Sequence, residues 1–281
     1  MNDQTRSRYS VSTVCLRQYD LVRALDVARS LGFDSVDLVG LRGLCEHVPV
    51  NGTTSEMRAA ARTFAASGLR AVSVNADPGS FDGFDDPVDV MRRVKRLIDF
   101  AAEAGAPILV LPAGEKSEQR TTDPQIARMA DALNEAGAKA ARNGVRLAVE
   151  APYFGRPIDR LARAAALMDA LVPSVQLAFD VSHIEAADES VAHAWQLLAA
   201  RVAIVHLRDA VSGDIRRVIG QGRVDFPAVF DAMRSTGYVG DTVLELETRN
   251  SPYATKEEEV LAAVEYLDAA CTAASRTRSY R

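Results

Sequence analysis

Short apolar segments alternate with longer amphipathic segments along most of the chain, and this alternation limits the possible folds more than any other feature. Apolar runs bounded by turn residues are typical of buried parallel strands, whereas apolar residues that recur every three or four positions indicate helices. Strands are predicted at residues 10–16, 35–39, 69–76, 107–111, 146–150, 175–180, 202–207 and 242–246. Helices are predicted at residues 19–31, 54–67, 87–104, 123–142, 158–171, 190–200, 226–236 and 256–273.

These segments make eight strand–helix pairs, which favours an α/β fold with a single (β/α)8 TIM barrel over an open doubly wound sheet. The length of 281 residues agrees, because such barrels commonly run to about 250 residues as one domain. We therefore expect one domain over residues 1–281, with flexible tails at about residues 1–8 and 275–281.

The composition is that of a globular protein with a large core, since 48% of the residues are hydrophobic and 25% are charged. The net charge of −5 argues against nucleic acid as a partner, because backbone phosphates are held mainly by Lys and Arg clusters. Cys15, Cys45 and Cys271 show neither zinc-site nor redox spacing. Neither a signal peptide nor a membrane helix is predicted, so we expect a cytoplasmic protein that binds small molecules, and a homo-oligomer is compatible with the sequence.

Four of the predicted strands end on a residue that can bind a metal or move a proton. These residues are Glu150, Asp180, His206 and Glu245. Because functional groups of a barrel collect at the carboxyl ends of its strands, we expect the four side chains to meet in one pocket. A single carboxylate at a strand end is more often a loop-facing or capping group. Four in the same position, three of them carboxylates, favour a site for Mn²⁺, Mg²⁺, Co²⁺ or Zn²⁺.

Other polar residues follow the same strands. His183 could donate to a substrate oxygen, serve as a further ligand, or cap a turn. Asp209 and Glu247 have the position to orient a metal ligand, although Glu247 could instead pair with Arg249. His47 and His193 are expected to face solvent and receive no role.

Gly220-Gln221-Gly222 follows the seventh predicted strand, where many barrels bind a substrate phosphate through loop amides. Arg216, Arg217 and Arg223 flank this segment, so an anionic substrate is one interpretation and a solvated loop is the other.

Several of these motifs together resemble the xylose isomerase-like TIM barrels, and within them the sugar phosphate isomerase/epimerase group with its inosose isomerases, inosose dehydratases and ketose 3-epimerases. The motifs are Glu150, Asp180-Val-Ser-His183, His206-Leu-Arg-Asp209, Ile219-Gly-Gln-Gly222 and Gly237-Tyr-Val-Gly240 followed by Glu245. The resemblance implies one divalent ion, with Mn²⁺ favoured, held by the residues at Glu150, Asp180, His206 and Glu245. It also implies that the side chain at His183 touches a carbohydrate substrate, and we expect Arg208, Arg216 and Arg217 to bind it too.

The activity expected from this resemblance is isomerisation or epimerisation through a metal-stabilised enediolate, with Glu150 and Glu245 exchanging protons on opposite sides of the substrate. A dehydratase acting on the same intermediate is the main alternative. A non-catalytic metal-binding barrel and a phosphodiesterase of the endonuclease branch are further alternatives. The last is disfavoured because that branch uses additional histidines and this chain has four in all.

Overall fold

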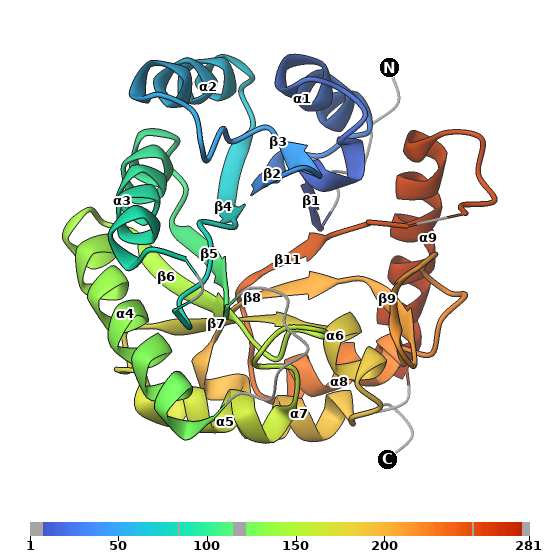
Figure 1. The fold of residues 1–281 in the computed structure, drawn as a ribbon. Coiled ribbons are helices and arrows are strands. Elements are labelled where there is room, and N and C mark those ends of the chain that lie inside the picture. Colours follow the sequence, from blue (N-terminus) through green and yellow to red (C-terminus); the bar gives the residue numbers. More distant parts are fainter. Residues whose placement is uncertain (1–7, 84, 115–121, 249, 277–281) are drawn as a thin grey trace.

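Eight parallel strands form a closed barrel that is surrounded by helices, as the alternation predicts (Figure 1). The computed structural model describes residues 8–83, 85–114, 122–248 and 250–276. The barrel strands are β1 (Ser10–Ser12), β2 (Ser35–Leu41), β4 (Arg70–Ala76), β5 (Ile108–Pro112), β6 (Arg146–Glu150), β7 (Gln176–Asp180), β8 (Val202–Leu207) and β11 (Asp241–Leu244). Strand β1 pairs with β2 on one side and with β11 on the other, which closes the barrel.

Several of the surrounding helices begin at side chains that cap them and end at glycines. The surrounding helices are α1 (Leu21–Ser30), α2 (Thr54–Ala66), α3 (Pro87–Glu103), α4 (Asp123–Arg142), α5 (Leu161–Ala170), α7 (Val191–Leu198), α8 (Phe226–Ser235) and α9 (Lys256–Arg276). The Asp20 carboxylate accepts a hydrogen bond from the Arg23 N–H and caps α1, and Thr53 and Glu56 form a capping box before α2. Gly32 follows α1 with a φ of 89°, the left-handed conformation that ends many helices.

Shorter elements account for the differences from the prediction. They are η1 (Thr13–Leu16), β3 (Cys45–Glu46), α6 (Val181–Ala186), η2 (Ala199–Arg201), β9 (Asp209–Val211) and β10 (Asp214–Arg217). The strand predicted at residues 10–16 stops at Ser12, because the Ser12 hydroxyl caps the turn η1. Helix α6 follows β7 without a loop, since the Asp180 carboxylate accepts from the Ser182 N–H and caps it.

Two hydrogen bonds of Cys15 connect η1 to the last strand of the barrel. The Cys15 thiol donates to the Leu244 carbonyl oxygen at 3.3 Å and accepts from the Leu246 N–H at 3.1 Å. The first and last segments of the barrel are therefore joined on both sides of Glu245.

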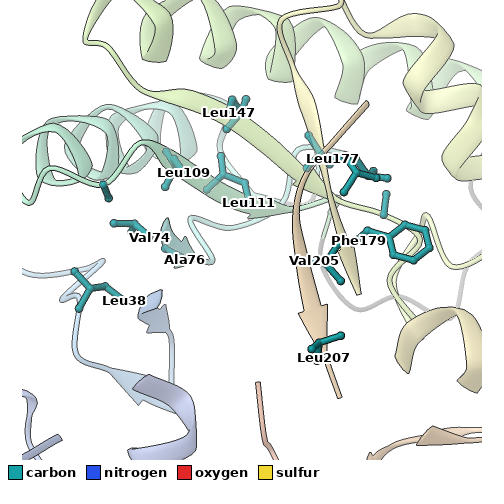
Figure 2. Packing of buried hydrophobic residues seen from close by; sticks show 14 of the residues in the cluster. Leu38, Val74, Ala76, Leu109, Leu111, Leu147, Leu177, Phe179, Val205 and Leu207 are labelled. Atoms are coloured by element: carbon teal, nitrogen blue, oxygen red, sulfur yellow. The ribbon is translucent and has the colours of Figure 1, made fainter. Parts of the chain in front are cut away.

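Side chains along each strand point alternately toward the helices and into the barrel. Leu147, Leu177, Phe179 and Val205 belong to the large core that includes the helices (Figure 2). A second apolar cluster fills inward positions and consists of Val72, Ile108, Val110, Ala148, Ala178, Ala203, Ile204 and Val243. The next inward position on each strand lies two residues further, at its carboxyl end. On β6, β7 and β8 these positions are Glu150, Asp180 and His206.

Parts of both expected tails are described, since α9 (Lys256–Arg276) extends into the C-terminal one. The tails expected at residues 1–8 and 275–281 lie mostly outside the described residues, although Arg8 is described and pairs with Asp268 of α9 at 3.1 Å. Within the described ranges, no helix combines the length and the apolar character that crossing a membrane requires.

Candidate metal centre and active site

The four predicted ligands lie together at the carboxyl ends of β6, β7, β8 and β11. One ligand atom from each of Glu150, Asp180, His206 and Glu245 lies within 4.8 Å of the others. All four residues are at most 3% exposed. The His206 Nδ1 atom lies 3.3 Å from Glu150 Oε1 and 3.0 Å from Glu245 Oε2, so the imidazole stands between the two glutamates.

Two atoms of this cluster show that its protein partners are incomplete. Among the residues that the structure describes, His206 Nε2 has no hydrogen-bond partner, and Glu245 Oε2 accepts no well-oriented hydrogen bond despite its distance of 3.0 Å from His206 Nδ1. Buried polar atoms are nearly always paired, because an unpaired one costs about 1 to 3 kcal/mol. The buried group fits one metal ion, which would give Glu245 Oε2 a partner.

Burial and charge separate the acidities of the two glutamates. Burial raises the pKa of Glu150 to about 7, although its hydrogen bond with His206 works in the other direction. Burial also favours the neutral form of Glu245, but the positive charges of His206 and Arg208 outweigh it and lower the pKa of that carboxyl. Two titratable groups whose pKa values are pushed apart are suited to opposite roles in proton transfer.

Arg208 lies behind Asp180, where it is almost completely buried. Its guanidinium donates to Asp180 Oδ2 at 2.5 Å, to Glu247 Oε1 at 2.9 Å and to the Ser182 hydroxyl at 3.0 Å. Burial favours the neutral acid at Asp180, but the Arg208 charge more than offsets this and lowers the pKa of the carboxyl. Arg208 therefore keeps Asp180 ionised and oriented, and Glu247 holds Arg208 rather than belonging to the ligand cluster.

His183 is also engaged by the protein on both of its ring nitrogens. Its Nδ1 accepts from the Phe154 N–H at 3.1 Å, and its Nε2 lies 3.1 Å from the Arg208 guanidinium. Burial lowers the pKa of His183 to about 3, so the ring is neutral, and because Nδ1 accepts from Phe154 the ring proton lies on Nε2. The Arg208 guanidinium is thus bound by protein groups, and the expected contacts of His183 and Arg208 with a substrate stay a prediction.

The glycine-rich segment after β8 is organised around Asp209. The Asp209 carboxylate accepts from the amides of Gly220 at 2.8 Å, Gly222 at 2.9 Å and Val224 at 3.2 Å. A Cβ atom on Gly222 would collide with this carboxylate, which explains the glycine. The amides predicted to hold a phosphate are therefore already bound to a buried side chain. Asp209 orients this loop and contacts none of the four clustered residues.

The arginines beside this loop have acidic partners of their own. Arg216 and Arg217 lie 3.4 Å and 3.3 Å from the Asp214 carboxylate on the same hairpin. Arg223 pairs with Glu185 at 3.0 Å on α6. Both arginines beside the loop therefore have a protein partner in this structure, and their expected contact with a substrate stays a prediction.

Sequence reasoning overlooked two polar residues near the cluster. Asn75 on β4 donates to Glu245 Oε1 at 3.2 Å, and the signal was an amide within the apolar strand at residues 70–76. Tyr153, in the loop after β6, stacks on His183 with the ring centroids 3.9 Å apart.

The other two histidines lie outside the cluster. The expectation that His47 faces solvent is wrong, because it is 7% exposed and bonded to the Tyr19 carbonyl oxygen at 2.9 Å. His193 is exposed, as expected.

A family model for xylose isomerase-like TIM barrels matches residues 25–270. The chain belongs to this family. Among its relatives is the L-ribulose-5-phosphate 3-epimerase UlaE of Salmonella typhi, which is 26% identical over 241 residues, covering 82% of this chain and 84% of the relative.

Solved structures of other xylose isomerase-like barrels share the fold at lower identity. An L-ribulose 3-epimerase superposes with a TM-score of 0.78 and 18% identity over 98% of both chains. The IOLI protein with a bound zinc atom gives a TM-score of 0.77 and 17% identity over 94% of this chain and 98% of that one. The D-psicose 3-epimerase of Clostridium cellulolyticum H10, in structures with D-tagatose, gives 0.76 and 14% over 94% and 99%.

Proposed function

We propose that the chain is a divalent-metal-dependent isomerase or epimerase of a sugar or a similar polyhydroxy carbonyl compound. The observation that carries the proposal is the buried group of Glu150, Asp180, His206 and Glu245, in which two polar atoms lack a satisfactory protein partner. The relatives support the same reaction class, since they include an L-ribulose-5-phosphate 3-epimerase and two ketose 3-epimerases.

The four clustered residues would hold one ion, and we propose Mn²⁺ because three carboxylates and one imidazole make an oxygen-rich donor set. When bound, the ion supplies positive charge beside the substrate carbonyl and an adjacent hydroxyl. Zn²⁺ is the competing choice, since the IOLI structure contains zinc.

The two glutamates carry the proton transfers in this proposal. The Glu245 carboxylate takes the proton from the carbon next to the carbonyl, and the electron pair of the broken C–H bond moves toward the carbonyl oxygen to give an enediolate. Glu150 returns a proton to the opposite face. Return to the same carbon gives the epimer, whereas return to the former carbonyl carbon gives the isomer. In the reverse direction the two carboxyl groups exchange roles.

Turnover in D₂O tests this assignment. L-ribulose, D-psicose, D-tagatose and L-ribulose 5-phosphate are incubated with the protein and Mn²⁺, and deuterium at the carbon next to the carbonyl is measured. We expect incorporation with at least one ketose. We also expect Glu150→Gln and Glu245→Gln to lower turnover by about 100-fold or more, because each keeps an oxygen but loses the base.

Glu265→Gln, the same change on the exposed face of α9, is the matched control and should leave turnover unchanged. Absence of deuterium together with near-normal turnover in both site variants would exclude the two-glutamate mechanism. Release of a dehydrated product instead would assign a lyase.

A further inference from the structure

The loop between β6 and α5 places an aromatic ring beside the candidate active site. Tyr153 lies three residues beyond Glu150, and its ring is tilted by 32° against the buried His183 ring at a centroid distance of 3.9 Å. The Phe154 N–H donates to His183 Nδ1, and the Tyr153 N–H donates to the Ile158 carbonyl oxygen at 2.7 Å. The backbone around Tyr153 is thus bonded both to α6 and to the far side of its own loop.

Arg156 covers the other side of the Tyr153 ring. Its guanidinium carbon lies 4.5 Å from the ring centroid. The same guanidinium binds Asp77 Oδ2 at 3.0 Å, beyond the end of β4, and the Gly114 carbonyl oxygen at 2.6 Å, beyond the end of β5. Three strand-end loops and α6 therefore hold the ring in one place, and little of the freedom of a surface tyrosine is left.

The Tyr153 hydroxyl differs from the rest of this assembly, since it makes no hydrogen bond with any residue that the structure describes. The side chain is half-buried. Burial, and next the negative charge of Glu150, raise the pKa of this phenol, so the hydroxyl stays protonated and lies within electrostatic range of Glu150. Packing alone would be served as well by phenylalanine, which has the same ring.

We propose that Tyr153 is a specificity-determining residue for the proposed reaction, and that its hydroxyl donates a hydrogen bond to a hydroxyl group of the substrate next to the reacting carbons. This inference rests on the proposed function and narrows the substrate class. The ring stacked between His183 and Arg156 fixes the position of the donor, so the site selects a compound with a hydroxyl at one defined position of the carbon chain. His183 supports the Tyr153 ring by stacking, and Arg208 holds Asp180.

Tyr153→Phe removes only the hydroxyl, which has no described protein partner, so we expect the stability of the fold to be unchanged. The experiment uses whichever of L-ribulose, D-psicose or D-tagatose the parent protein converts, together with its monodeoxy analogues, and measures kcat/KM with Mn²⁺ present. In the parent we expect one analogue to lose about tenfold or more, because its deoxy position leaves the Tyr153 hydroxyl without a partner. In Tyr153→Phe the complete ketose should lose a similar factor, and the discrimination against that one analogue should disappear.

Tyr266→Phe is the matched control, because it makes the same change on the outer helix α9. It should keep the parental discrimination at every position. A Tyr153→Phe variant that still distinguishes the ketose from all its deoxy analogues as the parent does would overturn the inference and leave the proposed function intact. Failure of the parent to convert any of the ketoses would instead overturn the proposed function, and the inference with it.

Discussion

Both halves of the barrel bury carboxylates, but the hydrogen-bond partners of these carboxylates differ. In the N-terminal half, Asp37 on β2 is fully buried, and its two oxygens accept from the hydroxyls of Ser12 at 2.8 Å and Ser73 at 2.6 Å. In the C-terminal half, the cluster around His206 leaves its Nε2 without a described partner. Both oxygens of Asp37 thus have protein partners, whereas His206 Nε2 has none among the described residues.

This difference shows that a buried acidic residue is not by itself a sign of a site. Burial raises the pKa of Asp37 to about 6, and the hydroxyls of Ser12 and Ser73 satisfy both of its oxygens without an ion. In the cluster, by contrast, the charge of Arg208 keeps Asp180 ionised, and the charges of His206 and Arg208 keep Glu245 ionised. Unpaired polar atoms and ionised carboxylates therefore distinguish the C-terminal half from the N-terminal half.

The largest expected effect comes from removing a ligand in the C-terminal half. We expect His206→Ala to lower the affinity for Mn²⁺ on the order of 100-fold, since each of four ligands contributes a comparable share of the binding free energy. Calorimetric titration of the metal-free protein measures this. Asp37→Asn is the control in the other half and should bind Mn²⁺ as the parent does. Equal losses in both variants would remove the distinction between the halves.

A smaller effect is expected on stability when Asp37 is replaced. The folded protein raises the pKa of Asp37 from 3.8 to about 6, so it binds a proton that the unfolded chain releases. The parent therefore loses stability as the pH rises from about 4 to about 6, whereas an asparagine has no charge to bury. Relative to the parent, Asp37→Asn should gain on the order of 1 to 3 kcal/mol over this range. Urea unfolding at both ends of the range measures it, and a constant difference would contradict the assignment.

The smallest effect is expected at the glycine-rich loop, whose amides and arginines have protein partners, as Asp37 does. Because Asp209 occupies the loop amides and Asp214 pairs with both arginines, Arg216→Ala combined with Arg217→Ala should change kcat/KM by less than about twofold. The comparison uses L-ribulose and L-ribulose 5-phosphate. A selective loss with the phosphate would restore this loop as an anion site.

Sequence reasoning predicted the barrel well because each strand is a continuous apolar run and each helix has a clear period. It also predicted the meeting of Glu150, Asp180, His206 and Glu245, since strand order alone brings their positions to one end of the barrel. The prediction of strand and helix ends failed where a side chain caps the next element. Ser12 caps η1 and ends the first strand, and Asp180 caps α6 directly after β7.

Side-chain partners could not be predicted in the same way. Arg208 and Asp209 are neighbours in the chain, yet one turns to Asp180 and the other to the amides of Gly220 and Gly222. Which partner each side chain binds depends on where that partner lies in the folded protein. Tyr153 was overlooked for the same reason, because its neighbours Arg156 and His183 come from different segments.

The two hydrogen bonds of Cys15 have a consequence for folding. They span 229 and 231 residues and hold the backbone on both sides of Glu245. Contacts between such distant parts of a chain form slowly, because a long loop must be closed before they contribute. An ion that needs both Glu150 and Glu245 as ligands can bind only after the barrel has closed. A higher concentration of free metal would then stabilise the folded protein relative to its folding intermediates.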